Sequence, residues 1–272
     1  MHISGETRAV VTGAGSGLGR AFARELARRG ARLVLSDVYL AGLDETERLV
    51  RAAGCAALVT RCDVTSADDV KALAEFAQEK LGGTDLLINN AGIAVAGPIG
   101  EVSLEDWRLQ LEVNLFGVIH GCHHFVPAML ARGTGHILNV ASMAGIVYVP
   151  DMGPYNVTKA GVIALSETLR AEVAGRGVGV TCLCPSFFPT EIAKSSRGVR
   201  DEGKLQFAEK LMKRSKWSAD DIARIALDGV EGGSFFVLPH ADGRWAWRLK
   251  RASPWLYAKL VDAVGQRALK RG

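Results

Sequence analysis

Short apolar runs alternate with longer amphipathic stretches along the chain. The runs are rich in Val, Ile and Leu with little polar alternation, which is typical of parallel strands covered on both faces. They predict seven strands, at Arg8–Thr12, Arg32–Ser36, Ala57–Arg61, Asp85–Asn89, His136–Ala141, Gly179–Cys184 and Ser234–Leu238. Helical spacing predicts helices at Gly17–Arg29, Ala67–Lys80, Leu104–Leu130, Tyr155–Val173 and Ala219–Val230. The alternation predicts an α/β fold, a doubly wound parallel sheet flanked by helices, with ligands at the carboxyl ends of the strands.

The chain divides into a large body and a short extension. No repeat or low-complexity linker interrupts residues 1–243, which we interpret as one domain. Ser66 and Ser218 precede predicted helices that have acids in their first turns, and both are predicted N-caps. Residues 244–272 form a helical C-terminal extension that is basic and rich in Trp, with Ser253-Pro254 predicted to begin its helix.

Composition narrows the class of protein. The 272 residues are 48% hydrophobic and 23% charged, which argues against disordered, collagen-like and disulfide-rich chains. No apolar run approaches the ~18 residues of a membrane span, and the first residues lack the pattern of a signal peptide. We therefore expect a cytoplasmic protein. The five cysteines are interpreted as reduced core residues, with Cys182 and Cys184 expected on opposite faces of a strand.

The net charge of +4 is unevenly distributed. Residues 244–272 hold eight basic residues and one acid, so residues 1–243 carry −3. Because the basic excess belongs to the extension, the body predicts no nucleic-acid partner. His120, His123 and His124 share a helix face, but no carboxylate or cysteine joins them at ligand spacing, and no metal site is predicted.

A glycine-rich turn follows the first predicted strand directly, in the segment Thr12-Gly13-Ala14-Gly15-Ser16-Gly17-Leu18-Gly19. Glycines permit positive φ and let backbone N–H groups approach a pyrophosphate at the start of a helix. Asp37 ends the second strand, 18 residues beyond Gly19. A carboxylate there can accept hydrogen bonds from the adenosine ribose and would repel a 2′-phosphate, so NAD is favoured over NADP. As an alternative, Asp37 caps a loop.

Tyr155 and Lys159 lie four residues apart on one predicted helix and so share a face. A cation within ~4–6 Å lowers a phenol pKa of ~10 by about 1–3 units, so Lys159 and an oxidised nicotinamide together could make Tyr155 a base near neutrality. Ser142, at a strand end, could hydrogen-bond the oxygen of an alcohol or ketone substrate. Alternatively, the Tyr and Lys lie on an ordinary helix surface and Ser142 is a turn residue.

These motifs together resemble those of the short-chain dehydrogenase/reductase family over residues 7–240. They are Thr12–Gly19, Asp63-Val64, Asn89-Asn90-Ala91-Gly92, Asn114, Ser142 and Tyr155-Asn156-Val157-Thr158-Lys159. The resemblance implies a Rossmann-type fold and an NAD(P)-dependent oxidoreductase with Asn114, Ser142, Tyr155 and Lys159 as its catalytic group. It implies that Asn114 breaks its helix and holds a water that connects Lys159 to solvent, and that Lys159 also binds the ribose. A partly exposed helix residue is the alternative for Asn114.

The resemblance also implies a set of cofactor contacts. Asp63 and Val64 would flank the adenine, and Asn90 and Gly92 would pass near the ribose. Pro185, Phe188 and Thr190 would hold the nicotinamide side, where Ser186 stands in place of the family's usual Gly. The whole implied set is Gly13, Ser16, Gly17, Leu18, Gly19, Asp37, Asp63, Val64, Asn90, Gly92, Tyr155, Lys159, Pro185, Phe188 and Thr190.

The family also implies a substrate-covering segment at about 191–217, and assembly into a homodimer or homotetramer. Met143, Val149, Phe187 and Phe188 would give the pocket an apolar wall, which favours a hydrophobic secondary alcohol or ketone. An NADPH-dependent ketoreductase and a non-catalytic dinucleotide-binding regulatory or scaffold protein are the alternatives. The extension packs on its own subunit or a partner in one interpretation, and contacts an anionic membrane surface in another.

Overall fold

The computed structural model describes residues 1–190, 197–198, 212 and 215–269. Seven parallel strands form one sheet in the order β3-β2-β1-β4-β6-β7-β9. Their bounds are β1 Arg8–Thr12, β2 Arg32–Asp37, β3 Ala57–Arg61, β4 Leu86–Asn89, β6 Gly135–Val140, β7 Val178–Leu183 and β9 Phe236–Val237. The predicted doubly wound sheet is confirmed. The strand order reverses between β1 and β4, which places a crevice at their carboxyl ends.

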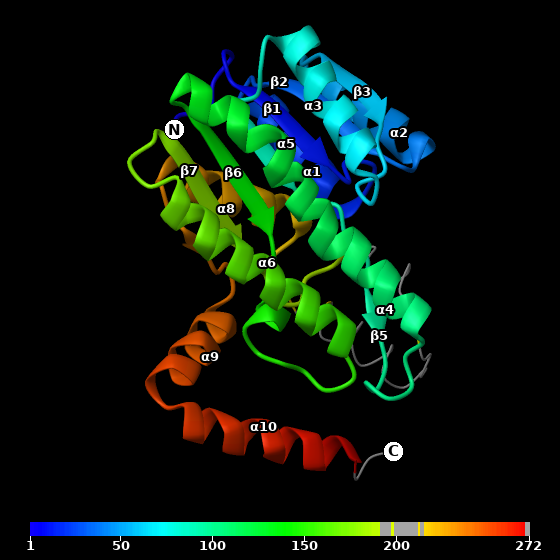
Figure 1. Cartoon of the computed structure of the whole chain (residues 1–272), viewed down its shortest axis with the longest axis vertical. Helices are drawn as coiled ribbons and strands as arrows, with labels where there is room; N and C mark the ends of the chain where they lie inside the picture. Colours follow the sequence, from blue (N-terminus) through cyan, green and yellow to red (C-terminus); the bar gives the residue numbers. More distant parts are fainter. Residues whose placement is uncertain (191–196, 199–211, 213–214, 270–272) are drawn as a thin grey trace.

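Helices cover both faces of the sheet (Figure 1). On one face α1 (Gly17–Arg28) packs against α2 (Leu40–Ala52) and α8 (Ala219–Glu231), and on the other α3 (Ala67–Leu81) packs against α5 (Gly117–Arg132). Helix α6 (Gly153–Glu172) completes the second face. Consecutive strand residues enter opposite cores, as Val10 and Val11 do in β1. Both cores are apolar, which explains the uninterrupted apolar runs in the sequence.

The long helix predicted over Leu104–Leu130 is interrupted at Asn114, which confirms the break implied by the family resemblance. The stretch expected as Leu104–Leu130 consists of α4 (Leu104–Leu111), a π-helical turn (Glu112–Phe116) and α5. The wider turn directs the Asn114 side chain toward the backbone of Ile93. The Ile93 N–H donates one hydrogen bond to Asn114, and the Ile93 carbonyl oxygen accepts another from it. Since the side chain is fully buried, these two bonds offset the local loss of regular α-helical bonding.

The predicted caps are confirmed by hydrogen bonds. Ser66 accepts from the Asp69 N–H at 3.1 Å, and Ser218 accepts from the Asp221 N–H at 3.2 Å and completes a capping box. Strand ends differ from the predictions by one or two residues. Sequence analysis did not predict α2, or the two-residue strands β5 (Val95–Ala96) and β8 (Arg197–Gly198), which pair with each other.

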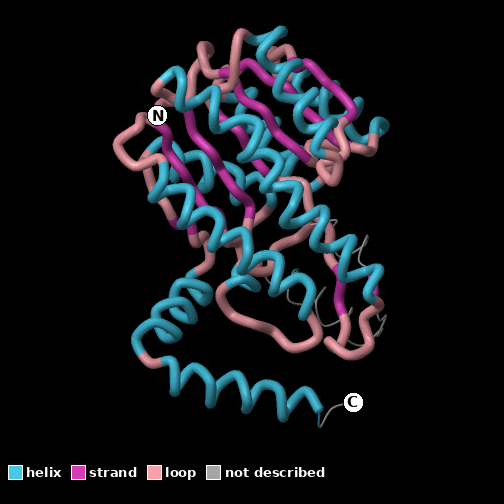
Figure 2. Tube along the Cα trace, in the orientation of Figure 1, coloured by secondary structure: helices cyan, strands magenta, loops and turns pink. Residues whose placement is uncertain are grey.

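Two helices follow the last strand and leave the body at the carboxyl end of the sheet. These are α9 (Ala241–Ala252), most of which falls in the predicted helical extension, and α10 (Pro254–Leu269), which begins at the predicted proline. Figure 2 shows the loop before α6 lying between the sheet and α10. The Tyr148 N–H of that loop donates to the Tyr257 hydroxyl of α10 at 3.2 Å. Among the described residues, no helix is long and apolar enough to cross a membrane.

The expected orientation of Cys182 and Cys184 is wrong. Both side chains are fully buried in the same core, and their sulfur atoms are 3.8 Å apart. Residues two apart along extended chain share a face, so these side chains point to the same side. All five cysteines are free thiols, and four of them are buried.

Candidate active site

The glycine-rich turn lies at the carboxyl end of β1 and packs tightly on the loop after β4. Gly13 has φ +65°, and a Cβ there would stand 2.7 Å from the Ala91 Cα. A Cβ on Gly19 would overlap the Gly13 carbonyl group. The turn therefore requires glycine at both positions, for its backbone conformation at the first and for space at the second.

Asn90 and Thr12 hold this turn in place. The Asn90 side-chain amide donates to the carbonyl oxygens of Thr12 and Gly13 at 2.9 and 3.0 Å. The Thr12 hydroxyl accepts from the N–H groups of Asn90 and Ala91 at 3.1 and 3.2 Å. The Asn90 side chain therefore stabilises the conformation of the glycine-rich turn. Thr12 was included in the predicted motif without a role of its own.

Asp37 does cap its loop, as the alternative interpretation stated. One carboxylate oxygen accepts from the Gly15 N–H at 2.8 Å, and the other accepts from the Tyr39 N–H at 2.9 Å. These bonds fix the carboxylate beside the turn. Each oxygen has a further lone pair, so capping is compatible with binding of a ribose hydroxyl.

The other predicted adenine-side residues lie at the carboxyl end of β3. Asp63 accepts two hydrogen bonds from Thr65, from its N–H at 3.0 Å and its hydroxyl at 2.8 Å. Val64 is buried against α5, where a Cβ on Gly117 would come within 2.8 Å of it. His120 lies 2.9 Å from the Val64 carbonyl oxygen, which can only accept, so the ring nitrogen Nδ1 carries the proton.

The turn leaves room for a phosphate at the start of α1. Gly17 has φ +48°, and a Cβ there would meet only the Thr190 hydroxyl, at 3.4 Å. Ser16 is the N-cap of α1, but its side chain makes no capping bond, while Leu18 is buried beneath the turn. The first backbone N–H groups of a helix favour an anion at this end. The geometry therefore fits the pyrophosphate of a dinucleotide.

Ser142, Tyr155 and Lys159 meet at the carboxyl end of β6. Ser142 follows the strand and forms a hydrogen bond with Tyr155, which lies in the first turn of α6. The Ser142 hydroxyl also accepts from the Ala144 N–H at 3.1 Å and lies 3.4 Å from the Pro185 carbonyl oxygen. The predicted trio is thus brought together, and Tyr155 is half-buried rather than enclosed.

Lys159 is 3% exposed, and its ammonium donates to the Val140 carbonyl oxygen at 2.8 Å. The ammonium lies 5.7 Å from the centre of the Tyr155 ring. Burial lowers the pKa of Lys159 to about 8, while Cys182 and Cys184 oppose the shift. The group is therefore mostly protonated at neutral pH and supplies a cation next to the phenol.

The expected acidity of Tyr155 is not present in the protein alone. Burial raises the pKa of Tyr155 to about 12, against the lowering effect of the Ser142 hydrogen bond. Desolvation of the tyrosinate outweighs the nearby groups because an anion loses much of its hydration there. Lys159 alone therefore does not make Tyr155 acidic, and the combined effect of Lys159 and an oxidised nicotinamide stays a prediction.

Asn114 and Lys159 lie on either side of Gly92. A Cβ at Gly92 would stand 3.3 Å from the Asn114 side-chain oxygen and 3.7 Å from the Lys159 ammonium. Asn114 accepts from the Ile93 N–H at 2.8 Å and donates to the Ile93 carbonyl at 2.9 Å. The alternative of a partly exposed helix residue is wrong, because the side chain is fully buried.

The loop after β7 reaches from Ser142 to the glycine-rich turn. The Pro185 carbonyl oxygen accepts from the Met143 N–H at 2.9 Å, and Phe188 is buried. Asp151 is the one non-glycine residue with positive φ in the described part of the chain, so Ser186 fits here without left-handed backbone strain. Most of the predicted substrate-covering segment lies outside the described residues.

Sequence reasoning missed three contributors to this site. The first is the Val140 carbonyl that holds Lys159, and the second is the buried Gln110, which donates to the Ile93 carbonyl at 3.2 Å. The third is His240, which accepts from the Ser186 N–H at 3.1 Å. A carbonyl partner has no sequence signal. Gln110 stood out only as a polar residue in an amphipathic stretch, and His240 only as a histidine after a strand.

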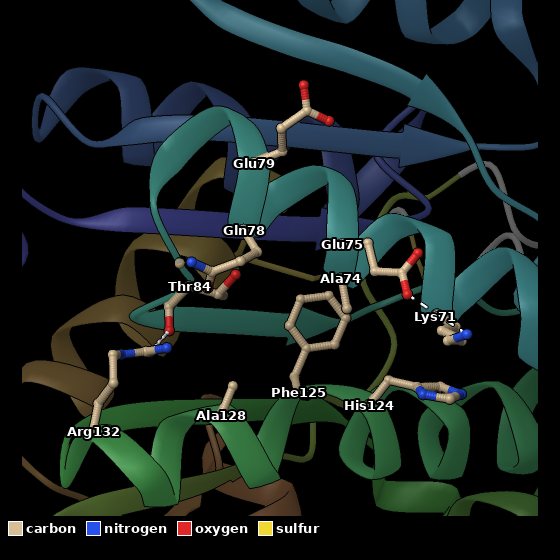
Figure 3. Close-up of a pocket in the computed structure, with 11 residues that line it drawn as sticks. Lys71, Ala74, Glu75, Gln78, Glu79, Thr84, His124, Phe125, Ala128 and Arg132 are labelled. Atoms are coloured by element: carbon tan, nitrogen blue, oxygen red, sulfur yellow. Dashed lines mark hydrogen bonds and ion pairs between the residues drawn. The ribbon is translucent and has the colours of Figure 1, made fainter.

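The histidine-containing face lies elsewhere. A groove of about 480 Å³ runs between α3 and α5, and Figure 3 shows His124 on its wall near Lys71 and Glu75. Lys71 and Glu75 form an ion pair at 3.6 Å. Within the described ranges, no group of three or more His, Cys, Asp or Glu side chains could hold a metal ion.

Comparison with known proteins agrees with this geometry. Residues 7–200 match the family model for short chain dehydrogenases. The oxidoreductase SadH of Mycobacterium tuberculosis is 35% identical over 94% of both chains. A cis-4-hydroxycyclohexanecarboxylate dehydrogenase of Sinomonas cyclohexanicum is 36% identical over 84% of this chain and 96% of the relative. A crystal structure of a short chain dehydrogenase/reductase from Burkholderia phymatum in complex with NAD superposes with a TM-score of 0.87, at 37% identity over 94% and 96% of the two chains.

The fold, the site and these similarities define the class. The chain belongs to the short-chain dehydrogenase/reductase family. It is an oxidoreductase enzyme that uses a nicotinamide dinucleotide as its cofactor.

Proposed function

We propose that this enzyme is an NAD-dependent dehydrogenase that interconverts a hydrophobic secondary alcohol and its ketone. The observation that carries the proposal is the convergence of Ser142, Tyr155 and Lys159 at the carboxyl end of the sheet, next to the glycine-rich turn. The Sinomonas relative, named as a dehydrogenase of a hydroxycyclohexane carboxylate, supports a secondary alcohol as substrate. The trio argues against a purely regulatory role, because such a role does not need a phenol paired with an ammonium.

Tyr155 and Ser142 have different roles at the substrate oxygen. The cofactor supplies a hydride acceptor or donor at its nicotinamide ring. Tyr155 takes the hydroxyl proton during oxidation and returns it during reduction. Ser142 donates a hydrogen bond to the same substrate oxygen and so stabilises negative charge that develops there.

Lys159 and Asn114 support the proton transfer. The Lys159 cation, 5.7 Å from the ring, stabilises the tyrosinate as it forms and also binds the cofactor ribose. Positive charge on the oxidised nicotinamide would act in the same direction on Tyr155. Asn114 holds the Ile93 backbone beside Lys159, in the position from which a water can connect the ammonium to solvent.

Asp37 is the basis for the choice of NAD. Its carboxylate is fixed by the Gly15 and Tyr39 N–H groups beside the turn, and it would repel a 2′-phosphate while accepting from a ribose hydroxyl. The remaining contacts that the family resemblance implies, from Asp63 to Thr190, are part of the same proposal. NADP is therefore the weaker cofactor in this proposal.

Apolar residues near Ser142 favour a hydrophobic substrate. Phe187 and Val149 are half-buried, in the loops that follow β7 and precede α6. The wall role proposed for Met143 needs revision, because its sulfur would be 2.8 Å from a Cβ on Gly243, so it packs on α9. Phe187 and Val149 are thus the more direct candidates for substrate contact.

A panel of alcohols and ketones tests the function. It should include cyclic, aliphatic, aromatic and sugar alcohols, with the absorbance of reduced nicotinamide followed for NAD and NADP. The proposal predicts highest kcat/KM for apolar secondary alcohols with NAD. Equal activity on sugars would contradict the substrate class, and stronger activity with NADP would contradict the cofactor choice. Light scattering tests the expected homodimer or homotetramer separately.

A further inference from the structure

His240 is a buried histidine that lies between β9 and α9, outside the predicted site. It is 8% exposed and occupies the N-cap position of α9, yet its side chain makes no capping bond to that helix. The side chain instead faces the loop after β7. The Ser186 N–H donates to His240 Nδ1 at 3.1 Å, and His240 Nε2 lies 3.5 Å from the Ser215 hydroxyl.

The hydrogen-bond directions fix the state of the imidazole. A backbone N–H can only donate, so Nδ1 must present its lone pair and the ring proton is on Nε2. Nε2 can then donate to Ser215, whose hydroxyl donates to the Trp217 carbonyl at 3.2 Å and accepts from the Trp217 N–H at 3.1 Å. Burial favours this neutral form by lowering the pKa of His240, against the raising effects of Asp242 and the Phe187 backbone; Arg244 also lowers it.

A single peptide unit connects His240 to Ser142. The Pro185 carbonyl and the Ser186 N–H belong to the same planar peptide group. Its oxygen accepts from the Met143 N–H at 2.9 Å and faces the Ser142 hydroxyl at 3.4 Å, while its N–H donates to His240. Contacts on both edges fix the rotation of this peptide plane, and hence the direction in which the chain continues toward Phe188 and Thr190.

We propose that His240 is a positioning residue for the nicotinamide side of the cofactor site. The neutral imidazole holds the Pro185–Ser186 peptide in the orientation that presents the loop to the cofactor. The same orientation keeps the Ser142 hydroxyl within hydrogen-bonding distance of Tyr155. The proposal rests on the proposed function only in its consequence for NAD binding. Its structural statement, that the imidazole fixes this loop, concerns the protein without cofactor.

Three substitutions separate positioning from simple packing. His240→Asn places an amide oxygen close to the position of Nδ1 and can still accept from Ser186. His240→Gln extends its polar group toward Ser215 and does not reproduce the Nδ1 acceptor. His240→Leu has a similar volume and no acceptor, so it leaves the Ser186 N–H without its partner.

Amide hydrogen exchange of peptides that span residues 184–190, measured by mass spectrometry on the cofactor-free protein, is the first readout. We expect exchange about tenfold faster in His240→Leu and His240→Gln, the order expected when a buried N–H loses its acceptor, and close to wild type in His240→Asn. If the Leu variant does not fold, the comparison of Gln with Asn still decides. Equal exchange in the Gln and Asn variants would overturn the proposal.

NAD binding is the second readout. We expect His240→Gln to raise the Kd of NAD about tenfold with an unchanged melting temperature, and His240→Asn to restore it. An unchanged Kd in the Gln variant would overturn the part of the proposal that concerns the cofactor site. If the wild type binds no NAD at all, the proposed function fails, whereas the exchange result still tests the loop contact independently.

Discussion

The ammonium of Lys159 lies 5.7 Å from the centre of the Tyr155 ring, one helical turn away on the same face of α6. Their pKa values move apart, since burial lowers that of Lys159 to about 8 and raises that of Tyr155 to about 12. Burial disfavours both charged forms, but Lys159 stays mostly protonated at neutral pH, whereas Tyr155 needs further positive charge to ionise. This relationship leads to two tests of the site.

Replacing Tyr155 with Phe removes the proton-transfer group while keeping the ring. We expect kcat to fall by about 10³-fold, within the range for a general acid–base, and the Kd of NAD to change little. Steady-state kinetics and fluorescence titration measure the two quantities. Tyr148→Phe is the matched control, because Tyr148 lies on the neighbouring loop and its ring contact with Lys250 survives the change. Substantial residual turnover in Tyr155→Phe would count against the mechanism.

Replacing Lys159 with Met should change how stability depends on pH. The folded-state pKa of about 8 lies below the usual 10.5, so the unfolded chain binds more protons between these values. Stability contributed by this group therefore rises with pH over that interval, and it is lowest below pH 8. From pH 7 to 9.5 the wild type should gain about 2 kcal/mol relative to Lys159→Met.

Urea unfolding at the two pH values, with reductant present, measures this difference. Lys71→Met removes an exposed lysine from α3 and controls for the loss of one positive charge. A wild-type curve parallel to that of Lys159→Met would show that burial of the ammonium does not penalise its charge.

Replacing Asp37 with Asn tests the choice of cofactor. The amide oxygen can still accept from the Gly15 N–H, so the turn should persist, but the negative charge is lost. We expect the affinity for NADP to rise about tenfold and that for NAD to fall a few-fold, because repulsion of the 2′-phosphate disappears. Titrations with both cofactors measure the change. The exposed Asp44→Asn is the control, and an unaltered NAD/NADP ratio in Asp37→Asn would refute the assignment.

Replacing Lys250 with Met tests the contact between α9 and the loop before α6. The Lys250 ammonium donates to the Ile146 carbonyl at 2.6 Å and lies 3.8 Å above the Tyr148 ring. Loss of both contacts loosens the loop that leads from Ser142 to Tyr155. We expect KM for the alcohol to rise about fivefold with a smaller effect on Kd of NAD.

Lys259→Met provides the matched control for this change. Lys259 also stacks on an aromatic ring, at 3.9 Å from that of Trp255, but Trp255 is 67% exposed on α10. The control should keep the wild-type KM. Equal effects of the two variants would indicate that the whole extension, rather than the Lys250 contact, determines substrate binding.

The sequence by itself determined the layered fold and the members of the trio. Parallel strands covered on both faces leave uninterrupted apolar runs, a close-packed turn leaves glycines at fixed spacing, and residues four apart on a helix must share a face. These are short-range consequences of backbone geometry. They placed Gly13, Gly17 and Gly19 in the turn and paired Tyr155 with Lys159, and the structure agrees.

Tertiary structure alone decided what surrounds those groups. The hydrogen bonds of Asn114 to Ile93, the Val140 carbonyl that holds Lys159, and the contact of His240 with Ser186 each join segments distant in the chain. The raised pKa of Tyr155 in the protein without cofactor has the same origin, because desolvation depends on atoms from several elements at once. Local pattern records which face a residue occupies. Burial and long-range partners arise only when those faces come together.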